Sequence, residues 1–153
     1  MIVSMSDNKE EIKNILLKVS HLAFEDGTNI DEWQPEINSN TVWAMVSEDD
    51  QNIAICKIRI VQNSMIEIHP YAIKEKAKKW KSIVMALLSW IYKNERINKV
   101  IALIGVNHDL TYRLSLKIGF KSEGLIKNSY LKNGQLLDQH LIGITRQEIG
   151  ELI

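Results

Sequence analysis

The feature that most constrains the fold is a strand, a turn, a long helix and a second strand in the middle of the chain. "SMIEIHP" has strand composition and is expected to end at Pro70, and an apolar set at helical spacing predicts a helix over about Lys76–Asn94. "KVIALIGV" follows, almost wholly apolar, which predicts a central strand buried by helices on both faces. Two strands joined through a long helix are expected to be parallel.

Hairpins are predicted on both sides of this crossover. "TVWAMVS" and "NIAICKIRIVQ" are rich in β-formers and are joined by "EDDQ", a hairpin connection. "FKSEGLIKNSYL" and "LLDQHLIGITR" are joined through Asn133-Gly134, a strong signal for a type I′ turn. We therefore expect antiparallel pairing in the outer parts of the sheet.

Helices are predicted at two further places. Asp7 and Glu10 have the spacing of a capping box, and the apolar residues after them predict a helix over about Asn8–Ala23. "DLTYRLSLKIG" predicts a short helix with Gly119 as its C-terminal cap. The segment between the first helix and the first hairpin is read as a loop, with one helical turn around Asp31–Glu36.

The predicted order is helix, three strands, helix, strand, helix and two strands, in one α/β domain over residues 1–153 with a mixed, mostly antiparallel sheet. A chain of 153 residues is long enough to bury a hydrophobic core without metal or disulfide support. A single cysteine, Cys56 in "IAICKIRI", allows no intramolecular disulfide and is expected to be a buried, inert thiol.

Composition narrows the possible partners. The formal net charge is +0, which argues against a dedicated nucleic-acid or anionic-membrane binder. The N-terminus lacks the pattern of a signal peptide, and no apolar run approaches the roughly 20 residues of a membrane span, so a cytoplasmic location is expected. The four histidines are scattered singly, so we expect no metal site.

One spaced set of residues makes the fold assignment specific. After the short helix comes Lys-x-Gly-Phe, then Glu-Gly, Asn-Gly and an Asp in the last hairpin. These residues are Lys117, Gly119, Phe120, Glu123, Gly124, Asn133, Gly134 and Asp138. The pattern resembles the C-terminal half of the GCN5-related N-acetyltransferase (GNAT) superfamily, and most closely its ribosomal-protein N-acetyltransferase branch. "IEIHPYAI" and "KKWKSIVMALLSWI" are similar to the strand, turn and helix of the same superfamily, so the resemblance covers about Thr41–Arg146.

The resemblance implies transfer of an acetyl group from acetyl-CoA to an amine of a protein or a small molecule. A backbone N–H on the strand before the long helix, near Ile68, would orient and polarise the thioester. Glu67 and His69 face the same side by alternation, and either could be the base that deprotonates the amine. The alternative is that Glu67 is a solvated strand residue and His69 a polar turn residue before Pro70.

The position that often holds an acidic tyrosine in this superfamily holds Ser115. Tyr112, one helical turn earlier, could substitute as the acid that protonates the CoA thiolate, or could pack against the sheet. Asn107 lies where relatives contact the CoA arm. Trp33, in the loop after the first helix, and Tyr71, after His69, are candidate acceptor-binding residues, although Trp33 could equally cap the core.

The pyrophosphate-binding loop of the superfamily falls on "EKAKKW" here, and neither of its usual glycines is present. Trp80 lies near a position that is normally small. Three interpretations remain open. In the first, some of Lys74, Lys76, Lys78 and Lys79 grip the phosphates, with Trp80 and Lys81 also at the cofactor site. In the second, no CoA binds, and in the third, the lysines are the solvated start of a helix.

The competing hypothesis is a catalytically inactive GNAT-like module with a binding or structural role. The "HPY" turn and the loop without glycine also resemble small GNAT-like proteins of bacteriophages, for which a virion or assembly partner, or a homodimer, is conceivable.

Overall fold

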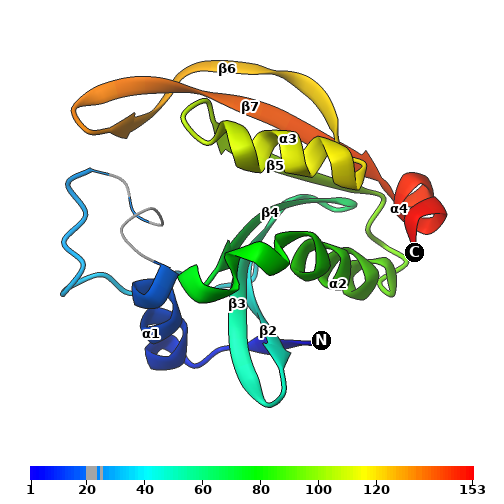
Figure 1. Cartoon of the computed structure of the whole chain (residues 1–153), viewed down its shortest axis with the longest axis horizontal. Helices are drawn as coiled ribbons and strands as arrows, with labels where there is room; N and C mark the ends of the chain where they lie inside the picture. The colour runs from blue at the N-terminus through cyan, green and yellow to red at the C-terminus, as the bar shows by residue number, and fades with distance from the viewer. Residues whose placement is uncertain (20–23, 25) are drawn as a thin grey trace.

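A seven-stranded mixed sheet with helices on both sides is the framework of the computed structural model, which describes residues 1–19, 24 and 26–153 (Figure 1). The strand order across the sheet is β1-β2-β3-β4-β5-β7-β6. The strands are β1 (Ile2–Ser6), β2 (Thr41–Glu48), β3 (Gln51–Gln62), β4 (Met65–Ala72), β5 (Lys99–Gly105), β6 (Lys121–Lys132) and β7 (Gln135–Thr145). The helices are α1 (Lys9–Val19), the 3₁₀ helix η2 (Lys74–Lys79), α2 (Trp80–Tyr92), α3 (Asp109–Ile118) and α4 (Arg146–Leu152).

The predicted parallel crossover is confirmed. Strand β4, helix α2 and strand β5 follow one another, and Met65–Glu67 pairs in parallel with Lys99–Ile101. All other strand pairs of the sheet are antiparallel. The α/β class and the mixed sheet expected from the sequence are therefore correct.

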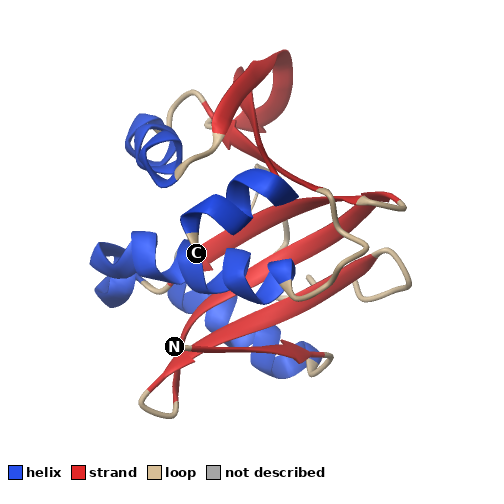
Figure 2. Ribbon diagram, turned by 90° about the vertical axis from the view of Figure 1, so that its right-hand side faces the viewer, coloured by secondary structure: helices blue, strands red, loops and turns tan. Residues whose placement is uncertain are grey.

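The two faces of the sheet carry separate cores. On one face, Ile12 and Leu16 of α1 pack against Trp43, Met45 and Ile55 of β2 and β3. On the other face, the larger core joins α2, α3 and α4 to the strands (Figure 2). Helix α2 supplies Ile83, Val84, Leu87, Leu88 and Ile91 to it. The α2 residues recur every three or four positions, so one stripe of the helix is buried.

Both predicted hairpin turns are confirmed. Asn133 and Gly134 have φ of 52° and 73°, as a type I′ turn requires. Asp49 and Asp50, between β2 and β3, have φ of 51° and 59°. Gly119 ends α3 with φ of 135°, a value that favours glycine.

Two terminal elements were not predicted. Strand β1 pairs antiparallel with β2 at the edge of the sheet, and α4 follows β7 directly. Helix α4 begins with a capping box in which Thr145 accepts a hydrogen bond from the Glu148 N–H and the Glu148 carboxylate accepts one from the Thr145 N–H. The predicted order of elements was therefore incomplete at both ends.

The predicted start of the first helix was one residue off. The cap is Asn8, whose side-chain oxygen accepts from the Glu11 N–H at 3.1 Å, and not Asp7 paired with Glu10. The predicted end at Ala23 lies outside the described residues. The single helical turn expected around Asp31–Glu36 lies earlier: the Trp33 N–H donates to the Asn29 carbonyl at 2.9 Å and closes one α-type turn, and residues 33–37 have no regular structure.

The boundaries around the long helix differ from the prediction. Strand β4 does not end at Pro70 but continues to Ala72, because β3 pairs with it along that whole length. The helix does not begin at Lys76 as α-helix, because Lys74–Lys79 forms a 3₁₀ helix before α2 begins at Trp80. The α-helix then ends at Tyr92 and not at Asn94.

Strand β5 was expected to be covered by helices on both faces, and this was wrong. Val100, Ala102 and Ile104 are buried in the main core, whereas Ile101 and Leu103 on the opposite face are only half-buried. Neither of these two belongs to either core cluster. The apolar character of the strand therefore exceeds what its packing against residues 1–19, 24 and 26–153 explains.

Candidate active site

The site predicted on β4 lies where two parallel strands separate. Glu67 and Ile101 form the last paired position, although β4 continues to Ala72 and β5 to Gly105. The Ile73 N–H donates to Ile53 on β3 at 3.0 Å, so by alternation the even-numbered residues of this part of β4 direct their backbone groups away from β3. Among those residues Pro70 has no N–H, and the parallel pairing of Glu67 with Ile101 takes up the Ile68 N–H, which leaves the Ala72 amide as the donor on that side.

Glu67 is the centre of a charged cluster beside this separation. Its side chain is 4% exposed, and its two oxygens have different partners. Oε1 lies 2.6 Å from His69 Nε2, and Oε2 accepts from Arg59 Nε at 3.1 Å and from Arg59 Nη2. The sequence prediction that Glu67 and His69 share one side of the strand is confirmed by this contact.

The cluster keeps Glu67 ionised. Burial raises the pKa of the carboxyl group, but hydrogen bonds and charges from His69 and Arg59 outweigh it and lower the pKa from its ordinary 4.5 to about 2. A carboxylate held this way is a weak base, so Glu67 is better suited to orient His69 than to accept a proton itself. With Nε2 occupied by Glu67, the His69 atom left to act as a base is Nδ1.

Tyr71 lies two residues beyond His69 and packs against the α1 core. Burial, with the nearby Cys56 and Glu67 groups, raises the pKa of its hydroxyl to about 12, so it stays a neutral donor. Cys56 is itself buried as expected, and burial raises the pKa of its thiol to about 12.

The candidate acids on α3 are placed for packing. Tyr112 stacks on His140 of β7, with ring centroids 3.9 Å apart and planes 12° from parallel, and it packs against the main core. Ser115 is 5% exposed within α3. Both are on the side of the sheet opposite to α1.

Asn107 follows β5 and is held by β6. Its side-chain oxygen accepts a hydrogen bond from the Tyr130 hydroxyl, which passes over Gly105. A Cβ at Gly105 would lie 2.1 Å from that hydroxyl oxygen, so no larger residue fits without moving Tyr130. The amide N–H₂ of Asn107 remains as the group for contact with a ligand.

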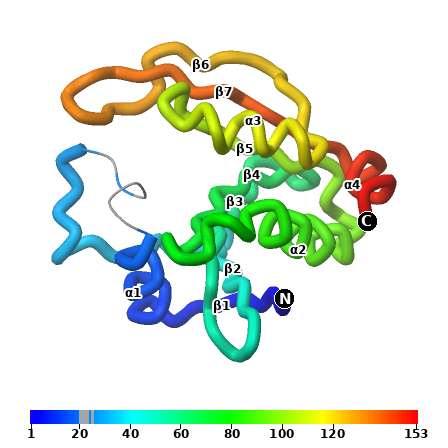
Figure 3. The backbone as a smooth tube through the Cα atoms, viewed as in Figure 1, coloured from blue at the N-terminus to red at the C-terminus, as the bar shows by residue number. Residues whose placement is uncertain are grey.

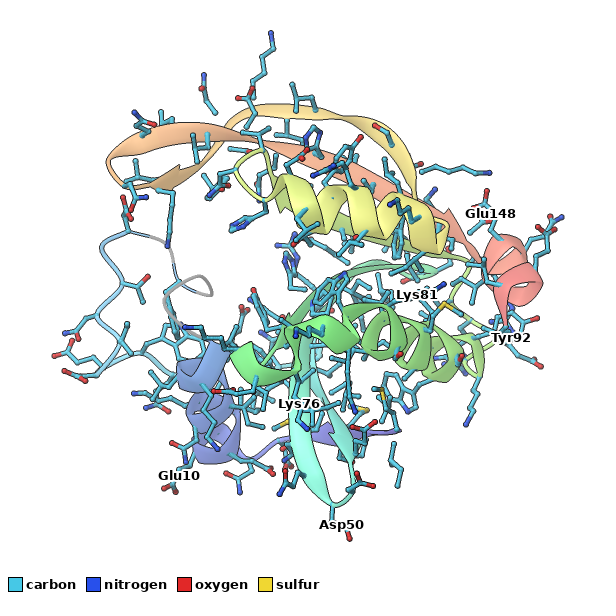
Figure 4. The ribbon with its side chains drawn as sticks, viewed as in Figure 1. Glu10, Asp50, Lys76, Lys81, Tyr92 and Glu148 are labelled. Carbon is cyan, nitrogen blue, oxygen red and sulfur yellow. The ribbon has the colours of Figure 1, made fainter. Side chains whose placement is uncertain are left out.

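The lysine-rich segment does not form a loop with open backbone N–H groups. The Lys76 N–H donates to Ile73, and the Trp80 N–H donates to Ala77, within the continuous turn from η2 into α2. Lys79 is ion-paired with Glu48 at the end of β2, which lowers the pKa of Glu48, and Lys76 also acts electrostatically on Glu48. Lys76 lies in η2 and Lys81 at the start of α2 (Figure 4). Lys78 and Lys81 are exposed.

Trp80 occupies the position that is normally small in the superfamily. It is half-buried and packs against the main core. Its indole Nε1 is buried and has no hydrogen-bond partner among the described residues. An unpaired buried donor of this kind is costly in a folded protein, and a ligand group at the start of α2 would satisfy it.

Trp33 is in contact with two other aromatic rings. It meets Phe24 edge to face at 5.1 Å and Trp43 at 6.5 Å, both by centroid distance. These contacts place it as a cap on the α1 core, the second of the two roles considered for it.

Arg59 was not identified as a site residue from the sequence. It contacts Glu67 because the two residues are paired across β3 and β4. The available signal was an arginine in an alternating strand beside a strand with a lone glutamate, but the register of the two strands was needed to pair them.

Other kinds of site are not supported by the described residues. Within the described part of the chain, no three His, Cys, Asp or Glu side chains group in a way that could hold a metal ion. No described helix is long and apolar enough to cross a membrane. A hollow of about 660 Å³ lies between α1 and the start of β3, but it is open and lined by Asn8, Glu11 and Asn52, away from His69.

Comparison with known families gives one match over nearly the whole chain. The family described as "Protein of unknown function (DUF2824)" matches residues 5–153. The chain belongs to this family. A search of curated proteins gives no match.

Solved structures of other proteins have the same fold as this chain. A chimera of spermidine N-acetyltransferase SpeG from Vibrio cholerae and hSSAT has a TM-score of 0.80 at 12% identity, covering 97% of this chain and 98% of that one. Spermidine N-acetyltransferase from Vibrio cholerae in complex with CoA and spermine has a TM-score of 0.78 at 13% identity, covering 97% and 96%. At this identity the similarity shows the fold, so the GNAT fold expected from the sequence is confirmed. The ribosomal-protein branch and the bacteriophage origin receive no support.

Proposed function

We propose that this protein is an acetyl-CoA-dependent N-acetyltransferase that acts on an amine of a small molecule or a protein. The observation that carries the proposal is the charged cluster of Arg59, Glu67 and His69 at the point where β4 and β5 separate. A histidine held by a buried carboxylate beside two unpaired strand edges is an arrangement suited to deprotonating an amine next to a bound thioester.

The strand separation fits the arm of acetyl-CoA. Beyond Glu67 the even-numbered residues of β4 face away from β3, so an extended amide-containing chain can pair with them as an added strand does. The Ile68 N–H closes the last parallel pair with β5, so the Ala72 N–H is the donor of β4 that would orient the thioester oxygen. Asn107 and the unpaired Trp80 Nε1 are further donors for the same ligand.

Lysine side chains, and not backbone N–H groups, would bind the pyrophosphate of acetyl-CoA. Because η2 replaces the glycine loop and its N–H groups are partly used within the turn, exposed Lys78 and Lys81 would supply charge to the phosphates. Lys79 contributes less, since Glu48 already holds it.

The reaction balances with groups of this chain. Acetyl-CoA supplies the acetyl group as a thioester. His69 Nδ1 takes a proton from the amine, the amine nitrogen forms the new C–N bond as the C–S bond breaks, and the proton passes to the departing thiolate. Glu67 keeps the His69 ring oriented, and Arg59 keeps Glu67 ionised. No group on α3 is required, because a CoA thiolate is a tolerable leaving group.

Titration calorimetry with acetyl-CoA, combined with detection of CoA thiol release in the presence of amines, tests the proposal. Binding at micromolar to millimolar concentration and amine-dependent thiol release are expected. Absence of heat and of a thermal shift at millimolar acetyl-CoA would refute it.

The second hypothesis, a catalytically silent module, has one supporting feature, the missing glycines of the pyrophosphate loop. It does not account for the buried Glu67 carboxylate that Arg59 and His69 hold, because burying a charged group is costly. A cytoplasmic location and a homodimer are part of the proposal, as is the domain assignment to residues 1–153.

A further inference from the structure

One face of strands β5, β6 and β7 carries apolar side chains that no helix covers in the described part of the chain. Leu103 pairs with Leu141 across β5 and β7, so both project from the same face as Ile101. Leu137, four residues before Leu141 on β7, and Tyr130, which lies over Gly105, share that face. We call these five residues, Ile101, Leu103, Tyr130, Leu137 and Leu141, the apolar strand face.

This face is distinct from both cores. All five side chains are half-buried, and none belongs to the core on α1 or to the core on α2, α3 and α4. The buried partners of the same strands, such as Val100 and Ile142, project to the opposite side. The apolar strand face is therefore an apolar surface within the fold that contributes little to either core.

The apolar strand face adjoins the proposed base. Glu67 is paired with Ile101 in parallel register, so the two side chains share a face. His69 is two residues beyond Glu67, and Leu103 two residues beyond Ile101, so they lie on facing edges of the strand separation. A molecule resting on the apolar strand face would have its end at His69.

Charge on these strands does not favour a polycation. Strands β3 to β7 contain six Lys or Arg residues, Lys57, Arg59, Lys99, Lys121, Lys127 and Lys132, but three carboxylates. Glu67 is paired with Arg59 and His69, and Glu123 with Lys99 at 2.7 Å. Asp138, which accepts from the Asn128 N–H at 2.8 Å, lies by alternation on the opposite face, with Ile142. A second or third ammonium group would find no unpaired carboxylate on this face of the strands and would lose hydration without compensation.

We propose that the apolar strand face is the acceptor site and that it takes a primary amine carried on an aliphatic or aromatic body, with a single positive charge. This deepens the proposed function and rests on it. The apolar body would cover Leu103 and Leu141, and the amine would reach His69 Nδ1. The polyamine bound in the Vibrio cholerae enzyme would be a poor acceptor here.

Two measurements on the whole protein test this separately from catalysis. The first is the effect of 2-phenylethylamine and of spermidine on the methyl NMR signals of leucine and isoleucine, with no CoA present. The second is kcat/KM for acetylation of the two amines. We expect 2-phenylethylamine to shift the Leu103 and Leu141 methyl signals, and its kcat/KM to exceed that of spermidine by roughly tenfold or more.

Leu103→Glu places an unused carboxylate on the face and is expected to lower kcat/KM for 2-phenylethylamine about tenfold and to raise it for spermidine. Leu110→Glu, on the 64%-exposed side chain in α3, is the matched control and should change neither. Leu141→Gln, a neutral change at the same face, should lower only the first value, and it replaces Leu103→Glu if that variant does not fold.

The outcomes are distinguishable. Methyl shifts with 2-phenylethylamine but no acetylated product would support the acceptor site and refute the acetyltransferase. Acetylation of spermidine in preference to 2-phenylethylamine would overturn the acceptor class and leave the acetyltransferase standing. The absence of any Leu103 or Leu141 shift with 2-phenylethylamine would overturn the site itself.

Discussion

The two halves of the sheet differ in how their faces are covered. Strands β2 and β3 have α1 on one face and α2 on the other, so Ile55 and Cys56, adjacent in sequence, are both 0% exposed in different cores. Among the described residues, helices cover strand β5 only on the face of the α2, α3 and α4 core. Ile101 and Leu103 remain half-buried beside the buried Val100 and Ala102. The apolar residues of β2 and β3 are explained by packing in the two cores. Packing does not explain Ile101 and Leu103 of β5, so another role is needed for them.

The boundary between the halves is also where the site lies. Pairing between β4 and β5 ends at Glu67 and Ile101, and the charged cluster begins there. Asp26 contacts the tip of the β6–β7 hairpin, where it accepts from the Gly134 N–H at 2.8 Å. Figure 3 shows the segment before β2 on the same side of the molecule as that hairpin. The covered half therefore provides rigidity, and the uncovered half provides access.

The largest effect is expected from His69→Ala, at the boundary. Loss of the base should lower kcat/KM by about 10²–10⁴-fold. The fold should be retained, because the side chain is 26% exposed and belongs to neither core. Steady-state kinetics with and without added imidazole measure the effect. Partial rescue by imidazole is expected, and activity within threefold of wild type would exclude His69 as the base.

One truncation in β3 and one in β5 test the difference between the covered and the uncovered strands. Ile55→Ala should destabilise the protein by about 2–5 kcal/mol, because it opens a cavity in a fully buried core. Leu103→Ala should cost about 1 kcal/mol, because its side chain already contacts solvent. Urea unfolding measures both. Equal losses would mean that the apolar strand face is an ordinary part of the core, and the proposed acceptor site would then lose its basis.

The sequence predicted the framework because local signals agreed with the fold. The Asn133-Gly134 turn, the apolar stripe of α2 and the Gly119 cap each follow from residue chemistry within a few positions, and all are confirmed. Helix α4 had a readable signal in the Thr145–Glu148 capping-box spacing. The short β1 had none, since its place is set by pairing with a distant strand.

The site was only partly predictable. Alternation placed Glu67 and His69 on one side, but it could not show that Arg59 is paired with them, because register is a property of two strands. Alternation also could not show that β5 has one uncovered face, since a continuous apolar strand has the same sequence whether the second face meets a helix or a ligand. Lys79 was expected at the phosphates but is held by Glu48, a partner 31 residues away.

The next largest effect is expected from removing the charge of Glu67, which lies where β4 and β5 separate. Because the pKa of Glu67 is about 2 in the folded protein and 4.5 ordinarily, its ionised form stabilises the fold above pH 4.5. That contribution is lost as the pH falls from about 4.5 to about 2. Glu67→Gln should lower stability by roughly 1–3 kcal/mol at pH 7 and flatten this acid dependence.

Urea unfolding between pH 2 and 7 measures the Glu67 contribution, and Glu123→Gln is the control, a carboxylate 35% exposed and paired with Lys99. The control should shift stability by less than about 1 kcal/mol. In kinetics, Glu67→Gln should also lower kcat/KM, because the charged partner that orients the His69 ring is gone. An unchanged kcat/KM would leave Glu67 with a structural role alone.

The smallest effect is expected on acetyl-CoA affinity, from the lysines of η2 and of the start of α2. Lys78→Ala with Lys81→Ala should weaken acetyl-CoA binding by roughly threefold to tenfold, since two exposed charges each contribute modestly to phosphate binding. Lys79→Ala should weaken it less, because Lys79 is paired with Glu48, and its loss should appear mainly as lower stability. Titration calorimetry at two salt concentrations separates these cases, because screening should reduce the first effect. If Lys79→Ala has the larger effect on affinity, Glu48 must release Lys79 when the phosphates bind, and the covered half would then take part in binding as well as in support.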